Sequence, residues 1–301
     1  MLDKALRDLV HCEFKIGKFN FAFLDVLLAV CITFVGVQVR VPIFGALENP
    51  GLEGGMQQIG YCVGDFVLAL LMGFFTWKVT ENRLKTIGVY SLAVIWPVFA
   101  ANSAMNGGSE VIAAVAVVLC LGIAAAGKAY SAKTFWLVTL LVCGLQIQQS
   151  DGWGVKLTNC WPNVYTLFSE TGFINEYGYA GKLFVMGALL IVLYYISKLD
   201  FKVTGKLMVT SGLFFSLFIT FFYPFMNCRS GFLANVFALL LFVQDKKKFY
   251  VPMFLCIISY VSYALFHNGS IGIFYWIYAL GVLALTMDAG VNLYKQLHTG
   301  N

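Results

Sequence analysis

Residues 207–226 read LMVTSGLFFSLFITFFYPFM, an apolar stretch without a single charged side chain. A helix that crosses the hydrocarbon core of a bilayer needs roughly 20 such residues, and it satisfies its backbone polar groups internally. Hydrophobic residues make up 60% of the chain and charged residues 12%. Soluble domains are about half apolar and about a quarter charged. The sequence therefore predicts an integral membrane protein.

The same pattern recurs along the 301 residues and predicts an all-α, polytopic transmembrane bundle of about ten spans. The fifth and eighth spans are shorter than the others. The predicted spans are Asn20–Phe44, Gln58–Trp77, Thr86–Ser103, Glu110–Gly127, Thr134–Gln149, Ala180–Ile196, Leu207–Met226, Gly231–Gln244, Phe249–Phe266 and Ile271–Tyr294.

Basic residues are distributed unevenly between the two sides of these spans. Lys and Arg concentrate in cytoplasmic loops of membrane proteins. With a cytoplasmic N-terminus, the inner segments hold sixteen of the 20 basic residues, and the outer segments hold Arg40, Lys156, Lys182 and Arg229. The sequence thus predicts ten spans, with both termini in the cytoplasm, in a multi-pass protein of the plasma membrane. The net charge of +5 is scattered over short loops and does not indicate nucleic-acid binding.

Residues 1–19 form a segment of their own ahead of a single transmembrane domain, residues 20–301. Leu2, Leu6, Leu9 and Val10 share one helical face, and charged residues occupy the other. This pattern predicts an amphipathic helix lying on the cytoplasmic lipid surface. A solvated tail is the alternative.

Polar residues of interest gather in the predicted outer loops. The longest loop, residues 150–179, is rich in Trp, Tyr, Asn and Gly, which suits either a membrane interface or stacking on a sugar. Glu110 begins a span without a basic neighbour: it either faces an outer cavity or meets the positive end of its helix. Arg229 precedes another span, where its guanidinium suits either phosphate oxygens or lipid headgroups. The eight cysteines include no CxxC pair, and the three histidines are far apart, so no metal site is predicted.

Three stretches, taken in order, resemble the membrane-embedded type C glycosyltransferases, notably the bacterial mannosyltransferase-like group. Residues 64–80 and 90–128 resemble the family's span, basic turn and Pro-containing span. There the family has asparagine–serine–alanine followed by a tryptophan–glycine–glutamine–x–aspartate motif. Asn102, Ser103, Ala104 and Gly107 match, while Asn106, Gly108 and Glu110 replace the tryptophan, glutamine and aspartate.

The other two stretches lie in later outer loops. In PNVYTLF, residues 162–168, Asn163 and Tyr165 match an asparagine–x–tyrosine pattern. In PFMNCRSGFLANVFALLLF, residues 224–242, Met226 and Arg229 match a methionine–histidine–glutamate–arginine–tyrosine motif. The histidine, glutamate and tyrosine are replaced, so the chain resembles a reduced relative with degenerate motifs.

The resemblance implies a polyprenyl-phosphate sugar as donor, used at the outer face of the cell membrane. It implies that Arg229 contacts the donor phosphate. Among the other outer cations, Arg40 or Lys156 is expected to support Arg229. Asn102, Asn163 and Tyr165 are the remaining expected substrate contacts. The family's base is an aspartate in a long first outer loop. This chain has the short loop GALENPGLEGG there, so the expected catalytic carboxylates are Glu110, Glu48 and Glu53. No cofactor is implied, and nothing supports a divalent metal.

Two further functions remain open at this point. The chain could be a catalytically silent relative that binds lipid-linked sugar or acts as a scaffold. It could also be a small transporter, although most spans lack central ionisable residues and no internal repeat is evident. Cys160 and Cys228 both fall outside in this topology and could form a disulfide, provided that the outer side is oxidising.

Overall fold

The computed structural model of the chain describes residues 12–16, 19–24, 27, 31, 130–148, 150, 157–158, 160–167, 174–268 and 275–299, and the fold is described for these residues. The chain forms two compact units. The first comprises Met1–Ala125 and Leu239–Met253, and the second comprises Ala126–Ala238 and Phe254–Asn301. Each unit is considered separately below.

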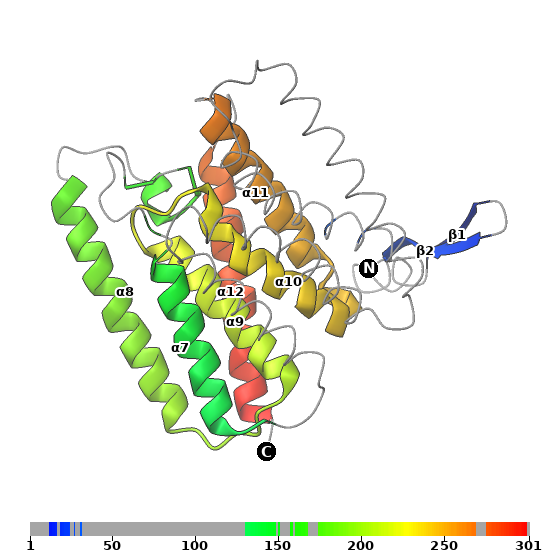
Figure 1. Ribbon diagram of the computed structural model, residues 1–301, viewed down its shortest axis with the longest axis horizontal. Coiled ribbons are helices and arrows are strands. Elements are labelled where there is room, and N and C mark those ends of the chain that lie inside the picture. Colours follow the sequence, from blue (N-terminus) through cyan, green and yellow to red (C-terminus); the bar gives the residue numbers. More distant parts are fainter. Residues whose placement is uncertain are drawn as a thin grey trace, which may run out of the picture. The chain divides into compact units, whose positions relative to one another are not determined.

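The described residues at the start of the first unit form a β-hairpin, drawn in blue in Figure 1. Strand β1 (Glu13–Ile16) pairs antiparallel with β2 (Phe19–Ala22), in a register that runs from Glu13↔Ala22 to Ile16↔Phe19. Two residues join strands in which polar and apolar side chains alternate, a pattern typical of hairpins. The end of the segment predicted as an interfacial helix, residues 1–19, is therefore a strand, and residues 1–11 lie outside the described part. The first predicted span was expected to begin at Asn20, but Asn20 lies in β2 and the described helical residues of this span begin at Phe23.

Six α-helices lie in the described part of the chain after residue 131. Each overlaps one of the last six predicted spans. The first four predicted spans lie outside the described residues, apart from residues 20–24, 27 and 31 of the first one. The largest difference between prediction and structure is at the start of the helix Ile174–Ser197, which was predicted to begin at Ala180. This helix extends beyond the apolar stretch and includes the polar residues Asn175 and Glu176. The helices are α7 (Ala132–Gln148), α8 (Ile174–Ser197), α9 (Gly205–Phe222), α10 (Phe232–Gln244), α11 (Tyr250–Asn268) and α12 (Tyr275–Thr299).

Helix α9 is the centre of the second unit. It packs against α7, α8 and α12, and 72% of its residues are buried. Thr204 caps its start by accepting a hydrogen bond from the Leu207 N–H (3.2 Å), and Pro224 follows its end. Gly212 admits the ring of Phe237 from α10, since a Cβ there would overlap that ring. Small residues of this kind let membrane helices approach closely.

Polar contacts give the relative directions of α7, α9 and α12 in the second unit. Tyr130, ahead of α7, bridges Val203, ahead of α9, so these two helices start at the same end. Gln296, late in α12, donates from Nε2 to the Thr210 hydroxyl at 2.9 Å, so α12 runs antiparallel to α9. Figure 1 shows α7, α8, α9 and α12 running alongside one another.

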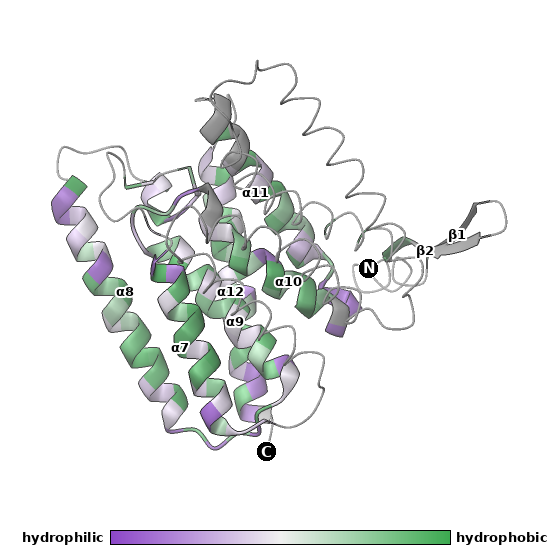
Figure 2. Cartoon of the chain, in the orientation of Figure 1, coloured by the Kyte–Doolittle hydropathy of each residue, from purple (hydrophilic) through white to green (hydrophobic). Residues whose placement is uncertain are grey.

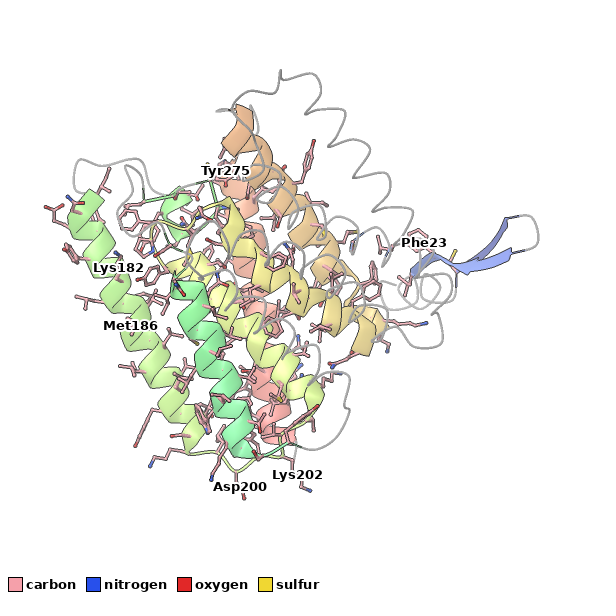
Figure 3. The ribbon with its side chains drawn as sticks, viewed as in Figure 1. Phe23, Lys182, Met186, Asp200, Lys202 and Tyr275 are labelled. Carbon is pink, nitrogen blue, oxygen red and sulfur yellow. The ribbon has the colours of Figure 1, made fainter. Side chains whose placement is uncertain are left out.

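This arrangement collects lysines at one end of the second unit, which we call the basic end. Figure 3 labels Lys202 and Asp200 there, and it shows Lys182 and Tyr275 toward the opposite end. All the lysines of the basic end are exposed. They are Lys133, Lys198, Lys202, Lys206 and Lys295.

The described part of the chain has the character of a helical membrane protein. Within it, α8, α9 and α12 as far as His298 are long and apolar enough to cross a membrane, and α7 and Phe232–Phe242 are shorter apolar helices. Hydrophobic residues run along these helices and hydrophilic ones concentrate toward their ends (Figure 2). Leu183 and Ile191 of α8 are 73% and 71% exposed. A helix face with large exposed apolar side chains is unfavourable in water but suits contact with lipid.

Candidate functional site

Two of the three polar stretches singled out in the sequence meet at the end of the second unit opposite the lysines. We call this region, Leu157–Leu167 together with Tyr223–Gly231, the loop end. The backbone N–H of Phe225 donates to the Leu157 carbonyl at 2.9 Å. The backbone of Met226 forms isolated β-bridges with Thr158 and with Ser150. These contacts hold the two stretches together.

Asn163 organises the first of these stretches. Its Oδ1 accepts hydrogen bonds from the Thr158 hydroxyl (2.8 Å) and from the Tyr165 N–H (3.0 Å). Its own N–H donates to the Thr166 hydroxyl at 3.0 Å. Asn163 therefore caps the short helix η2 (Val164–Leu167), whose first N–H groups have no partner within the helix.

Tyr165, the second residue matched by the resemblance, packs into the fold. Its hydroxyl donates to the Phe222 carbonyl at the end of α9 (3.1 Å), an acceptor that the helix itself leaves unsatisfied. The ring lies against Gly181 of α8, where a Cβ would overlap the hydroxyl. Burial raises the pKa of Tyr165 to about 12, so the phenol stays neutral and remains a donor at physiological pH. Its observed role is to tie η2 to α8 and α9.

Trp161 fixes the stretch to the start of α10. Its ring is fully buried against Gly231, where a Cβ would overlap the ring. The Tyr275 hydroxyl of α12 donates to the carbonyl of Cys160, a residue in the left-handed backbone region with φ 68°. The side chain of Cys228 lies outside the described atoms, so the pairing of Cys160 with Cys228 stays a prediction.

Two buried donors of the loop end have no hydrogen-bond acceptor in the described part of the chain. They are Nδ2 of Asn163 and Nε1 of Trp161, both on fully buried side chains. Burying a donor without an acceptor costs about 1–3 kcal/mol. An oxygen atom of a water or of a bound group would offset that cost. Asn163 thus keeps one polar atom that is not committed to the fold.

Arg229 lies in η3 (Cys228–Gly231), the short helix that leads into α10. Asn227 and Ser230 close this turn: the Asn227 N–H donates to the Ser230 hydroxyl (3.2 Å), and the Ser230 N–H donates to the Asn227 carbonyl (3.0 Å). Gln146 of α7 donates from Nε2 to the Ser230 carbonyl at 2.8 Å. The Arg229 backbone is therefore held beside Trp161 and α7, while its guanidinium lies outside the described atoms.

The remaining predicted site residues lie outside the described residues. These are the expected catalytic carboxylates Glu110, Glu48 and Glu53, and the expected substrate contacts Asn102 and Arg40. Three residues that join the loop end to its helices were not among the predicted site residues: Trp161, Tyr275 and Lys182. The ammonium of Lys182 lies 5.2 Å from the centroid of the Phe225 ring, which places a cation of α8 beside the loop end. Its only sequence signal was that it counts among the four predicted outer basic residues.

Comparisons with known proteins give no match: no family model, no curated protein and no solved structure is similar to the chain. The described residues contain no group of three or more His, Cys, Asp or Glu side chains placed to hold a metal ion.

Proposed function

We propose that the chain is a multi-pass protein of the plasma membrane with about ten spans, whose basic end faces the cytoplasm and whose loop end faces outward. The lysine asymmetry supports this orientation. The basic end of the second unit carries five exposed lysines, among them Lys198 and Lys295. By contrast, the described cation beside the loop end is Lys182 of α8, and the loop end itself contains Arg229 in its sequence. Positively charged loops are retained in the cytoplasm.

We further propose that the loop end binds a polyprenyl-phosphate sugar and transfers the sugar to an acceptor. The observation that carries this proposal is the packing of Leu157–Leu167, which contains the PNVYTLF stretch, against Tyr223–Gly231, which contains Arg229. A donor bound here would have its lipid tail against apolar helices and its phosphate beside arginine. Among the described atoms of the loop end, the donors without an acceptor are Nδ2 of Asn163 and Nε1 of Trp161, and both side chains are fully buried.

The chemistry of such a transfer divides between a cation and a base. Arg229, with Arg40, would stabilise the negative charge that develops on the phosphate leaving group. Glu110, or Glu48 or Glu53, would accept the proton of the attacking hydroxyl as the sugar is displaced. Asn102 would contribute a hydrogen bond to the donor. Each of these roles is inferred from the family resemblance and from the side-chain chemistry.

A second candidate is a catalytically silent relative that binds the lipid-linked sugar or acts as a scaffold. The observation that favours it is the use of predicted substrate contacts as structural groups. Oδ1 of Asn163 and the hydroxyl of Tyr165 are both occupied by bonds within the fold. Side chains committed in this way hold the loop in shape and need not contact a sugar.

One experiment separates these candidates. Membranes containing the wild type, Arg229→Gln, Glu110→Gln or the matched control Lys202→Gln are incubated with labelled polyprenyl-phosphate hexose, and both binding and transfer are measured. Lys202 is exposed at the opposite end of the unit, so its substitution removes the same charge away from the loop end. An active enzyme loses about 10²–10³-fold in transfer with Arg229→Gln, and none with the control.

The other outcomes are equally decisive. Binding without transfer in the wild type, weakened by Arg229→Gln, supports the silent relative. Neither binding nor transfer in the wild type overturns both the enzyme and the binder of lipid-linked sugar, and it leaves the scaffold. Accumulation of a labelled solute inside sealed vesicles would instead favour the transporter.

A further inference from the structure

The last turns of α8 and α12 carry the same pattern of side chains. Residues 194–198 read YYISK and residues 294–298 read YKQLH. In each segment a tyrosine is followed four positions later by a side chain that is, or can become, cationic. Residues four apart lie on the same face of a helix. The two helices therefore present matching aromatic and basic faces at the basic end.

A side-chain contact between Tyr195 of α8 and His298 of α12 joins the last turns of the two helices, and we call the aromatic and basic side chains of these turns the cluster. The centroids of Tyr294 and His298 are 4.1 Å apart, and Nδ1 of His298 lies 2.8 Å from the Tyr294 carbonyl. Because a carbonyl only accepts, Nδ1 of His298 carries a proton. The Tyr195 hydroxyl lies 3.2 Å from Nε2 of His298, and this hydrogen bond links α8 to α12. The Lys198 ammonium lies 5.1 Å from the centroid of the Tyr194 ring.

The cluster is open to its surroundings. Tyr194 and Tyr294 are 64% and 56% exposed, and Lys198, Lys295 and His298 are exposed as well. Helix α8 has 24 residues and so spans about 36 Å. That length exceeds the roughly 30 Å hydrocarbon core. A helix that spans the bilayer at this length carries its last turn into the headgroup layer, where tyrosine is enriched and lysine reaches phosphate.

Exposed apolar side chains lead from the cluster toward the middle of each helix. On α8, Leu190 and Ile191 precede Tyr194 and Tyr195 by one turn and are 65% and 71% exposed. On α12, Val291 precedes the cluster in the same way and is 51% exposed. A ligand with both acyl chains and an anionic headgroup would cover the apolar rows and the basic cluster together, whereas a free anion would cover only the cluster.

We propose that the cluster of Tyr194, Tyr195, Lys198, Tyr294, Lys295 and His298 is a binding site for the headgroup phosphate of an anionic phospholipid. The lysine ammonium groups donate charge-assisted hydrogen bonds to the phosphate oxygens. The tyrosine rings lie beside the glycerol region, and the acyl chains follow the apolar rows of α8 and α12. This site does not depend on the proposed sugar transfer at the loop end.

The test compares lipid binding by two double variants with equal loss of charge. Lys198→Gln/Lys295→Gln removes two cations from the cluster, and Lys133→Gln/Lys202→Gln removes two exposed cations of the basic end outside it. Purified full-length protein is titrated with a fluorescent phosphatidylglycerol or phosphatidylcholine in detergent micelles. The wild type should prefer phosphatidylglycerol. Each lysine near an anionic headgroup contributes about fivefold, so the cluster variant should bind about thirtyfold more weakly, while the control keeps the preference of the wild type.

A measurement on the wild type alone guards against a variant that fails to fold. A photoactivatable phosphatidylglycerol should cross-link to peptides containing residues 194–198 or 294–298, and excess inorganic phosphate should not displace it. The proposal would be overturned if both double variants weakened binding equally or if the wild type bound the two lipids equally. It would also be overturned if the cross-links were confined to other segments or if inorganic phosphate displaced the lipid.

Discussion

Substitution of Gly181 by alanine tests the packing that holds the loop end to α8. An alanine Cβ at this position would overlap the Tyr165 hydroxyl and would lie 3.0 Å from Cζ of the same ring. The hydroxyl must then move away from the Phe222 carbonyl, to which it donates at 3.1 Å. We therefore expect Gly181→Ala to destabilise the protein although alanine is the better helix former.

The magnitude follows from three contributions. Overpacking of a filled site costs about 1–3 kcal/mol. Loss of the hydrogen bond to the Phe222 carbonyl costs about 1 kcal/mol. The higher helix propensity of alanine offsets at most about 1 kcal/mol. Gly181→Ala should therefore lower stability by about 1–3 kcal/mol, the sum of these terms.

Gly187→Ala is the matched control, because it lies in the same helix and a Cβ there would meet nothing within 4 Å. It should be neutral or stabilising by up to about 1 kcal/mol. Apparent melting temperatures are compared in one detergent at one scan rate, since membrane proteins often unfold irreversibly. Tyr165→Phe removes the overlapping hydroxyl, so the double variant Gly181→Ala/Tyr165→Phe should lose less stability than the two single changes added together. Equal behaviour of Gly181→Ala and Gly187→Ala would refute the packing of Tyr165 on α8.

Three further outcomes follow from buried polar groups. Burial raises the pKa of Tyr165 from 10.0 to about 12, so the stabilising contribution of its neutral phenol is complete below about pH 10 and is lost as the pH rises to about 12. The stability of Tyr165→Phe should therefore fall less than that of the wild type across this range. Unfolding measurements and tyrosinate absorbance follow the two effects. Gln146→Leu leaves the buried Ser230 carbonyl without its donor and should cost about 1–3 kcal/mol in thermal unfolding; Gln148→Leu, at an exposed position of the same helix, should cost little. Asn235→Ala removes a 2.8 Å hydrogen bond from α10 to a hydroxyl of α11 and should cost about 1 kcal/mol in the same assay.

Much of the described helical architecture follows from hydropathy alone. The predicted spans Thr134–Gln149 and Gly231–Gln244 differ from α7 and α10 by at most two residues at either end. The reason is physical: an apolar stretch of this kind buries its backbone polar groups only as a helix. The hairpin Glu13–Ala22 was missed because its alternating pattern is short and adjoins a long apolar stretch, which suggested a continuous helix.

The sidedness of the chain predicted that the two loops would lie on the same side, but not what their side chains would do there. Leu157–Leu167 and Tyr223–Gly231 follow helices that run in the same direction, so both emerge at the same end. Asn163 was predicted to contact a substrate, and this contact stays a prediction; in the structure its Oδ1 caps η2. A cap and a ligand contact require the same kind of side chain, and only the neighbouring N–H groups distinguish them.

The positions of the helices within the bundle show where hydropathy stops being informative. Helices α8 and α9 are both apolar enough to cross a membrane. However, 22% of the residues in the 18-residue apolar stretch of α8 are buried, whereas 72% of those in α9 are buried. Lipid tails and a protein interior are equally apolar, so burial between helices adds no hydrophobic driving force in a bilayer. The difference lies in small and polar side chains. Helix α9 carries Thr210, Ser211, Ser216 and Thr220, all buried, whereas the apolar part of α8 has no hydroxyl other than the phenols of its exposed tyrosines until Ser197. Small hydroxyl residues permit close helix packing and interhelical hydrogen bonds, as between Ser211 and Thr139 (3.4 Å), and so they mark the central helix where hydrophobicity does not.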